Sequence, residues 1–258
     1  MKQLANHALS WLYPRTCAAC KVIMPLNPSE ESIDILCMRC ESLFDPIPLP
    51  TCPICGNQVE EEVERCSSCY GKTFYFESNH AAFLYEDLLK DLFHDMKFRG
   101  KKRVAEALGK LWASQLKIAP HIFPKELHEK KIIFIPLPLH PQKRRERGFN
   151  QAELMAVELS NSFDGTAVLP ILKRLFDTPP QSGLHPKQRE ENVSGIFGIA
   201  PDYSPEPEAV YIVVDDIYTT GASLNECCKT LRAWGAQRVM TMTLAVPVKK
   251  PDEAEKNS

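Results

Sequence analysis

The segment from Tyr211 to Ser223, YIVVDDIYTTGAS, combines residue types that can bind a sugar phosphate. A β-branched apolar run predicts a buried strand, two acids follow it, and a turn of small residues then opens a helix. Backbone N–H groups at a helix start bind phosphate, and the hydroxyl groups of the turn add hydrogen bonds. The candidates for binding a 5-phosphate are Thr219, Thr220, Gly221, Ala222 and Ser223.

Asp215 and Asp216 follow the strand predicted at 211–214. Open α/β sheets bind ligands at the carboxyl ends of their strands, and carboxylates accept hydrogen bonds from vicinal sugar hydroxyls. With the turn that follows, the two acids predict a ribose 5-phosphate site in which both are catalytic candidates. The alternative is a solvated acidic turn before an ordinary capped helix. The order of strand, acids, turn and helix favours the ligand site.

A basic segment after an earlier predicted strand could bind pyrophosphate. Residues 136–140, PLPLH, predict a stiff turn, and four cations and Gly148 follow it. Such cations can neutralise a diphosphate, and backbone N–H groups of the turn can add donors. The candidates are Leu139, His140, Lys143 and Arg147, with Arg144 and Arg145 between them. The start of a solvated basic helix and a nucleic-acid patch are the alternatives.

Eight of the ten cysteines precede Tyr70 and form four C-x-x-C pairs, the spacing that chelates a tetrahedral zinc ion. Disulfides would require an oxidising compartment, and a redox site would have one such pair beside a βαβ unit. We expect two structural Zn²⁺ sites. Sequential pairing is favoured over interleaved pairing, and the ligands are Cys17, Cys20, Cys37, Cys40, Cys52, Cys55, Cys66 and Cys69.

Apolar periodicity predicts the elements that position these residues. Helical patterns cover 85–98, 104–116, 151–163 and 224–234, and buried strands are expected at 132–137, 167–172, 211–214 and 238–246. The alternation of strands and helices predicts a mostly parallel sheet flanked by helices. We expect a zinc module at 1–75, an α/β domain at 76–248 and a frayed tail at 249–258.

Several other motifs carry less chemistry. Gly71-Lys72-Thr73 ends like a phosphate-binding P-loop, but Cys66 stands where that motif needs its first glycine. Cys227 and Cys228 lie on the apolar stripe of a predicted helix and are expected in the core. The polar stretch 177–195 is long enough to be a lid, and its Arg189 could supply a loop cation or be a solvated charge.

The chain has 258 residues, and its formal net charge of −2 excludes a strong global field for nucleic acid or membrane surfaces. The N-terminal segment lacks the apolar run of a secretory signal, and charges or prolines interrupt every apolar stretch. We therefore expect a cytoplasmic protein without membrane insertion. The sequence does not determine its oligomeric state.

The segment from Tyr211 to Ser223 resembles the phosphoribosyl pyrophosphate motif of type I phosphoribosyltransferases at all thirteen positions. The segment FIPLPLHPQKRRERGFNQ from Phe134, MKFRGK from Met96 and the cysteine pairs extend the resemblance to the ComF family, the competence-protein-F-like phosphoribosyltransferases. This resemblance implies a double zinc ribbon joined to a type I phosphoribosyltransferase domain. It also implies a role in DNA uptake during natural transformation, and it makes Arg189 a catalytic candidate in the lid.

Two functions follow from the motifs and the resemblance together. The first is an Mg²⁺-dependent enzyme that moves ribose 5-phosphate from phosphoribosyl pyrophosphate to an unknown acceptor. The second is a non-catalytic sensor of phosphoribosyl pyrophosphate that binds single-stranded DNA or a partner from the competence machinery.

Overall fold

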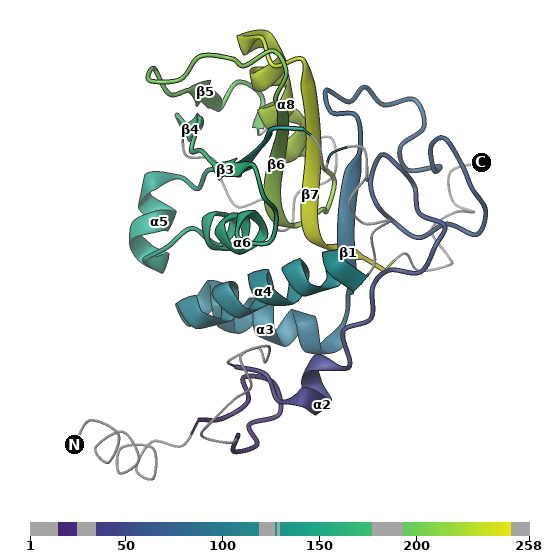
Figure 1. Ribbon diagram of the computed structural model, residues 1–258, viewed down its shortest axis with the longest axis vertical. Helices are drawn as coiled ribbons and strands as arrows, with labels where there is room; N and C mark the ends of the chain where they lie inside the picture. The colour runs from purple at the N-terminus through teal and green to yellow at the C-terminus, as the bar shows by residue number, and fades with distance from the viewer. Residues whose placement is uncertain (1–14, 25–34, 119–126, 128–129, 177–192, 249–258) are drawn as a thin grey trace.

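The structure, a computed structural model, describes residues 15–24, 35–118, 127, 130–176 and 193–248. Five parallel strands form the central sheet in the order β1-β7-β6-β2-β3 (Figure 1). Their bounds are Asn79–Tyr85 for β1, Ile132–Pro136 for β2, Thr166–Val168 for β3, Val210–Ile217 for β6 and Arg238–Pro247 for β7. The predicted parallel sheet is confirmed.

Helices cover both faces of this sheet, as the predicted periodicity requires. One face carries α3 (Asp87–Phe98), α4 (Lys102–Ile118) and α6 (Gln151–Ser160), and the opposite face carries α8 (Ala222–Trp234) (Figure 1). All four were predicted, with ends that differ by only a few residues. Within the described residues, no helix is both long enough and apolar enough to cross a bilayer.

Strand β6 lies in the middle of the sheet and contributes side chains to two separate hydrophobic cores. Ile212 and Val214 belong to the core under α3, α4 and α6, whereas Tyr211 and Val213 belong to the core under α8. This division follows from the two-residue period of a strand. It explains why the segment is continuously apolar and does not alternate with polar residues.

The two cysteine-rich segments pack on opposite faces of the sheet. Leu36 and Phe44 of the first segment join the core of α3 and α4, and Ile54 of the second joins the core of α8. The second segment is also held by the buried Asn79, whose Nδ2 donates to the Cys55 carbonyl at 3.0 Å and to Thr243 Oγ1 at 3.2 Å. Each zinc module is therefore an extension of one core.

The structure divides one of the expected strands. The segment 167–172 is divided between β3 and β4 (Leu172–Arg174), which pairs antiparallel with β5 (Phe197–Ile199) in a separate sheet. Pro170 lies between them, and proline has no N–H for a continuous ladder.

Strand β1 was not predicted, because it starts with the polar Asn79 and His80, and Asn79 is buried by its hydrogen bonds rather than by apolar character. The expected domain limits at 75 and 76 stay predictions, and residues 249–258 lie outside the described residues.

Candidate functional site

The site lies where the chain direction across the sheet reverses. From β2 the chain passes through α6 to β3 on one side, and from β6 it passes through α8 to β7 on the other. Because α6 and α8 cover opposite faces, the carboxyl ends of β2 and β6 border a crevice, the usual ligand position in such sheets. Pro136 is paired with Val214 there, so the two predicted ligand-binding segments are neighbours.

Asp215 and Asp216 lie within β6, which continues to Ile217 and does not end at Val214 as expected. Successive side chains of a strand point to opposite faces, so the two carboxylates have different surroundings. Asp216 is 4% exposed, and its Oδ2 lies 2.7 Å from Lys97 Nζ and accepts from Gln151 Nε2 at 3.3 Å. Asp215 Oδ1 accepts the Asp216 N–H at 2.8 Å. The two acids are therefore not equivalent.

Burial raises the pKa of Asp215 to about 8, and the negative charge of Asp216 adds to this shift. A hydrogen bond from the Asp216 N–H and the charge of Lys97 oppose the shift without cancelling it. Asp215 is thus protonated near neutral pH in the free protein, and an arriving cation would favour its ionised form.

Lys97 is a site residue that the sequence analysis did not identify. Its ammonium group lies 5.2 Å from the centre of the Phe93 ring on the buried side of α3, which brings it to Asp216. The signal in the sequence is its position one helical turn after Phe93, on the apolar stripe. A lysine on that stripe can reach a buried acid with its charged end.

The basic segment after β2 forms the short helix α5 (Pro141–Arg147), so Lys143 and Arg147 lie on a helix, whereas Leu139 and His140 lie in the turn before it. Pro141 starts the helix, His140 caps it by accepting the Gln142 N–H, and Gly148 ends it with φ of +83°. Lys143 and Arg147 are one turn apart and partly buried, whereas Arg144 pairs with Glu153 at 2.9 Å. Arg144 and Arg145 are exposed.

Hydrogen bonds connect this helix and its turn to the acids. Arg147 Nη1 donates to Gln151 Oε1 at 2.5 Å, and Gln151 in turn donates to Asp216. Asn150 Nδ2 donates to the Leu137 carbonyl at 3.0 Å, which fixes the turn that carries the partly buried Leu139 and His140. Neither Asn150 nor Gln151 was assigned a role from the sequence.

The turn that we expect to bind phosphate lies at the start of α8. Gly221 has φ of +75°, and a Cβ atom there would collide with the Tyr218 side chain, so glycine is required for two reasons. Thr220 Oγ1 accepts the Ala222 N–H at 3.4 Å, Thr219 is exposed and Ser223 is partly buried. The turn begins four residues after Asp215 in the chain. Arg189, the lid candidate, lies outside the described residues.

The eight cysteines form two groups of four, Cys17 with Cys20, Cys37 and Cys40, and Cys52 with Cys55, Cys66 and Cys69. Within each group all Sγ atoms lie within 4.8 Å of one another, and the Cys20–Cys37 and Cys55–Cys66 pairs are 3.6 and 3.7 Å apart. Tetrahedral zinc with Zn–S bonds of about 2.3 Å requires S–S separations of about 3.8 Å. The groups therefore fit zinc, and sequential pairing is confirmed.

Donors around the sulfur atoms suit thiolate ligands. The Cys37 N–H points to Cys17 Sγ and the Cys66 N–H points to Cys52 Sγ, each at 3.4 Å. Asn57 Nδ2 donates to Cys55 Sγ at 3.3 Å. Such donors stabilise the charge of coordinated thiolates, and four protein ligands leave no position open for catalysis.

We expect purified protein to contain two zinc ions per chain, measured by mass spectrometry of the metal. Cys17→Ser with Cys52→Ser should remove both ions, because each substitution damages a different group. Cys52→Ser with Cys66→Ser should remove only one. The opposite result would show interleaved pairing.

Lys97→Met should destabilise the protein by on the order of 3 kcal/mol, because it leaves the buried Asp216 without its cation. Asp216→Asn should have a comparable cost, and the double variant should cost less than the sum of the two, measured by urea unfolding. Strict additivity would contradict the ion pair.

The raised pKa of Asp215 predicts a loss of stability with rising pH. Between pH 6 and 8 the unfolded chain has this acid ionised while the folded chain keeps it protonated, so the free energy of unfolding falls by at most about 1.4 kcal/mol per pH unit. Asp215→Asn should remove this fall in urea unfolding with zinc present. Parallel pH profiles for the two proteins would contradict the shift.

Comparisons with known proteins agree with the motifs. Residues 8–70 match the family model of the double zinc ribbon domain. Competence protein F of Haemophilus influenzae is 29% identical over 212 residues, 81% of this chain and 90% of that protein. Competence protein ComFC of Bacillus subtilis is 26% identical over 257 residues, 93% of this chain and 99% of that protein.

Among solved structures, a hypoxanthine phosphoribosyltransferase from Staphylococcus aureus matches with a TM-score of 0.33 and 15% identity, over 55% of this chain and 62% of that one. The relatives in sequence are more informative because they span nearly the whole chain. The chain is thus similar over most of its length to competence proteins of the ComF family, with a double zinc ribbon at its N-terminus, as its motifs predicted.

Proposed function

We propose that the α/β domain binds phosphoribosyl pyrophosphate with Mg²⁺ and transfers ribose 5-phosphate to an acceptor, releasing pyrophosphate. One observation carries the proposal. The turn 219–223, the acids at the end of β6 and the cations of α5 surround the carboxyl ends of two adjacent strands. In a ligand with one phosphate, a diol and a diphosphate, the phosphate would face the turn, the diol would face the acids and the diphosphate would face the cations.

The 5-phosphate would bind at the start of α8. Its backbone N–H groups and the positive end of the helix dipole favour an anion. Thr219, Thr220 and Ser223 would add hydroxyl donors. A phosphate held there places the ribose toward the end of β6.

The acids would hold the ribose and stabilise positive charge on it. Ionised carboxylates accept hydrogen bonds from ribose hydroxyls and favour the oxocarbenium character that develops at the anomeric carbon. Lys97 and Gln151 keep Asp216 fixed, so the buried acid would orient the sugar without reorganising. Asp215, with its raised pKa, would ionise as cationic charge arrives.

The leaving pyrophosphate would lie against α5. Lys143 and Arg147 provide cations, and the turn through Leu139 and His140 provides backbone donors. A carboxylate at this end of β6 suits Mg²⁺ that arrives with the ligand, because Mg²⁺ in proteins commonly takes one or two carboxylates plus substrate phosphates. When bound, Mg²⁺ would neutralise charge on the departing diphosphate.

The names of the relatives support a biological role for this activity. Proteins called competence proteins match most of this chain, so we place its activity in DNA uptake during natural transformation. The described residues supply no obvious general base for an acceptor, and the acceptor stays unassigned.

Calorimetric titration with phosphoribosyl pyrophosphate should show binding that requires Mg²⁺. The double variant Asp215→Asn, Asp216→Asn should bind at least tenfold more weakly, since two carboxylates that hold the sugar are lost. Arg145→Ala, which removes an exposed cation on the same helix, is the matched control and should bind normally. Absence of binding by the wild type would refute the proposal.

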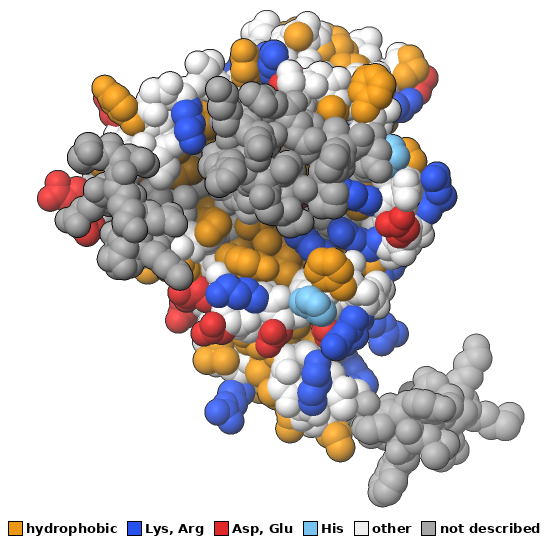
Figure 2. All heavy atoms as spheres, turned by 180° about the vertical axis from the view of Figure 1, so that it is seen from behind, with side chains coloured by type: hydrophobic (Ala, Val, Ile, Leu, Met, Phe, Trp, Pro, Cys, Tyr) orange, Lys and Arg blue, Asp and Glu red, His pale blue; other side chains and the backbone are white. Residues whose placement is uncertain are grey.

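A second candidate function is binding of single-stranded DNA in which the ribose phosphate site acts as a sensor. The observation that favours it is a basic cleft of about 570 Å³ between the first zinc ribbon and the start of α4. Its cations suit the phosphates of a nucleic-acid backbone. The basic lining residues are Arg15, Lys21, Lys101, Lys102 and Arg103. Figure 2 shows Lys and Arg side chains gathered along one flank of the molecule.

For this second function, Lys102→Ala with Arg103→Ala should weaken binding of a labelled oligothymidine at least tenfold. Affinity in the wild type should fall steeply with salt, because phosphate contacts release counterions. Lys90→Ala on the exposed side of α3 is the control. Binding that is insensitive to both salt and the substitutions would exclude this surface.

A further inference from the structure

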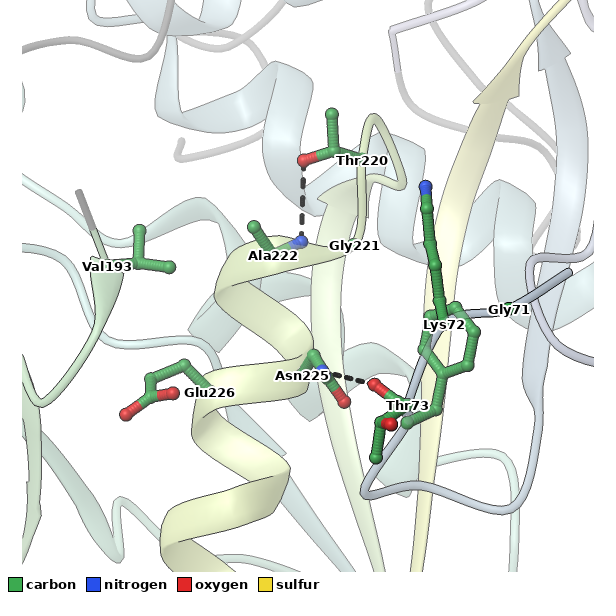
Figure 3. A pocket seen from close by; sticks show the side chains of 10 residues that line it. Gly71, Lys72, Thr73, Val193, Thr220, Gly221, Ala222, Asn225 and Glu226 are labelled. Atoms are coloured by element: carbon green, nitrogen blue, oxygen red, sulfur yellow. Dashed lines mark hydrogen bonds between the residues drawn. The ribbon is translucent and has the colours of Figure 1, made fainter. Parts of the chain in front are cut away.

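A cavity of about 360 Å³ joins the second zinc ribbon to the candidate phosphate turn. One wall comes from residues 71–74 that follow the last cysteine pair, and the other comes from Thr220, Gly221 and Ala222 at the start of α8 (Figure 3). The two walls are far apart in the sequence. The zinc ribbon therefore borders the ligand site directly, which no motif indicated.

Lys72 is the cation of this cavity. Figure 3 shows its side chain extended toward the turn that carries Thr220 and Gly221. Within the described residues its ammonium group forms no ion pair or hydrogen bond. The other charged lining residue, Glu226, accepts the Gly195 N–H at 2.7 Å and lies 3.8 Å from Lys229 Nζ. The uncompensated charge in the cavity is positive.

The backbone around Lys72 is fixed by the zinc knuckle. The Lys72 N–H donates to the Cys69 carbonyl at 3.3 Å, and the Lys72 carbonyl accepts from Arg65 Nη1 at 3.1 Å. Gly71, with φ of +71°, makes the turn that directs the chain from Cys69 to Lys72. The position of Lys72 thus depends on the geometry of the four cysteines.

The segment after Lys72 is attached to α8. Asn225 Nδ2 donates to the Thr73 carbonyl at 3.0 Å and Asn225 Oδ1 accepts the Tyr75 N–H at 2.8 Å, so one amide holds two backbone groups. Arg232, from the same helix, donates through Nε to the Tyr75 carbonyl at 3.2 Å. These contacts set the distance between the ribbon and the helix start.

We propose that the second zinc ribbon completes the ligand site, with Lys72 as a binding residue for the 5-phosphate and Asn225 as the residue that positions it. The inference rests on the proposed function, since it takes the phosphate turn as the 5-phosphate site. It assigns the ribbon a part in ligand recognition in addition to its structural role. It also makes ligand affinity dependent on zinc in the second site.

Lys72→Ala should weaken binding of both ribose 5-phosphate and phosphoribosyl pyrophosphate with Mg²⁺ by about tenfold in calorimetric titrations, because one charge-assisted contact is lost. Lys72→Arg should retain most of the affinity, and Lys90→Ala should change nothing. Zinc content and the midpoint of thermal unfolding should match the wild type, since the Lys72 side chain is exposed.

The other outcomes separate the inference from the proposed function. Wild-type binding with an unaffected Lys72→Ala would overturn the assignment of Lys72 and leave the proposed function intact. Weakening for phosphoribosyl pyrophosphate alone would overturn the assignment to the 5-phosphate. Absence of wild-type binding would overturn both.

Asn225→Ala tests the positioning role. Alone, the substitution should weaken binding of ribose 5-phosphate. In a chain that already carries Lys72→Ala it should cause little additional loss of affinity, because both substitutions remove the same contact. Fully additive losses in affinity would overturn the role of Asn225.

Discussion

The structure depends on a central parallel strand that must be buried on both faces. Because residues 210–214 of β6 are all apolar, each face needs a complete hydrophobic cover, and the chain supplies it with helices on both sides and one zinc ribbon for each core. The ribbons are too short to bury much surface alone, so zinc and the α/β domain stabilise them together. Asn79 shows how close this connection is, since one buried amide contacts the Cys55 carbonyl and strand β7.

The same strand explains the asymmetry of the candidate site. At the carboxyl end of β6, successive side chains point to opposite faces of the sheet, so Asp216 faces α3 and α6 and Asp215 faces α8. Asp216 obtains Lys97 as a cationic partner, whereas burial and the negative charge of Asp216 raise the pKa of Asp215 to about 8. Two neighbouring acids of one type thus have different charge states because of the layer each one faces. An acid pair of this kind can combine one carboxylate in a fixed position with one carboxyl group that ionises when a cation arrives.

Predictions from the sequence hold where a local pattern determines local structure. Helices with apolar residues at three- and four-residue steps, buried strands and cysteine knuckles all follow from neighbouring residues, and these were predicted. Such predictions fail where a distant segment of the chain determines the local structure. Asn79 starts a strand because β7 lies beside it, and residues 172–174 leave the main sheet because they pair with β5.

By itself, the sequence determined which chemistry the protein can carry: eight thiolates in chelating pairs, two acids after a strand, a glycine turn before a helix and a group of cations. These are properties of residue type and spacing. Only the tertiary structure decided which of these groups meet. Lys97 reaches Asp216 and Lys72 reaches the cavity beside Gly221 because the sheet order and the docking of the ribbon on α8 bring distant segments together. Such long-range contacts depend on packing between elements, and no spacing along the chain encodes them.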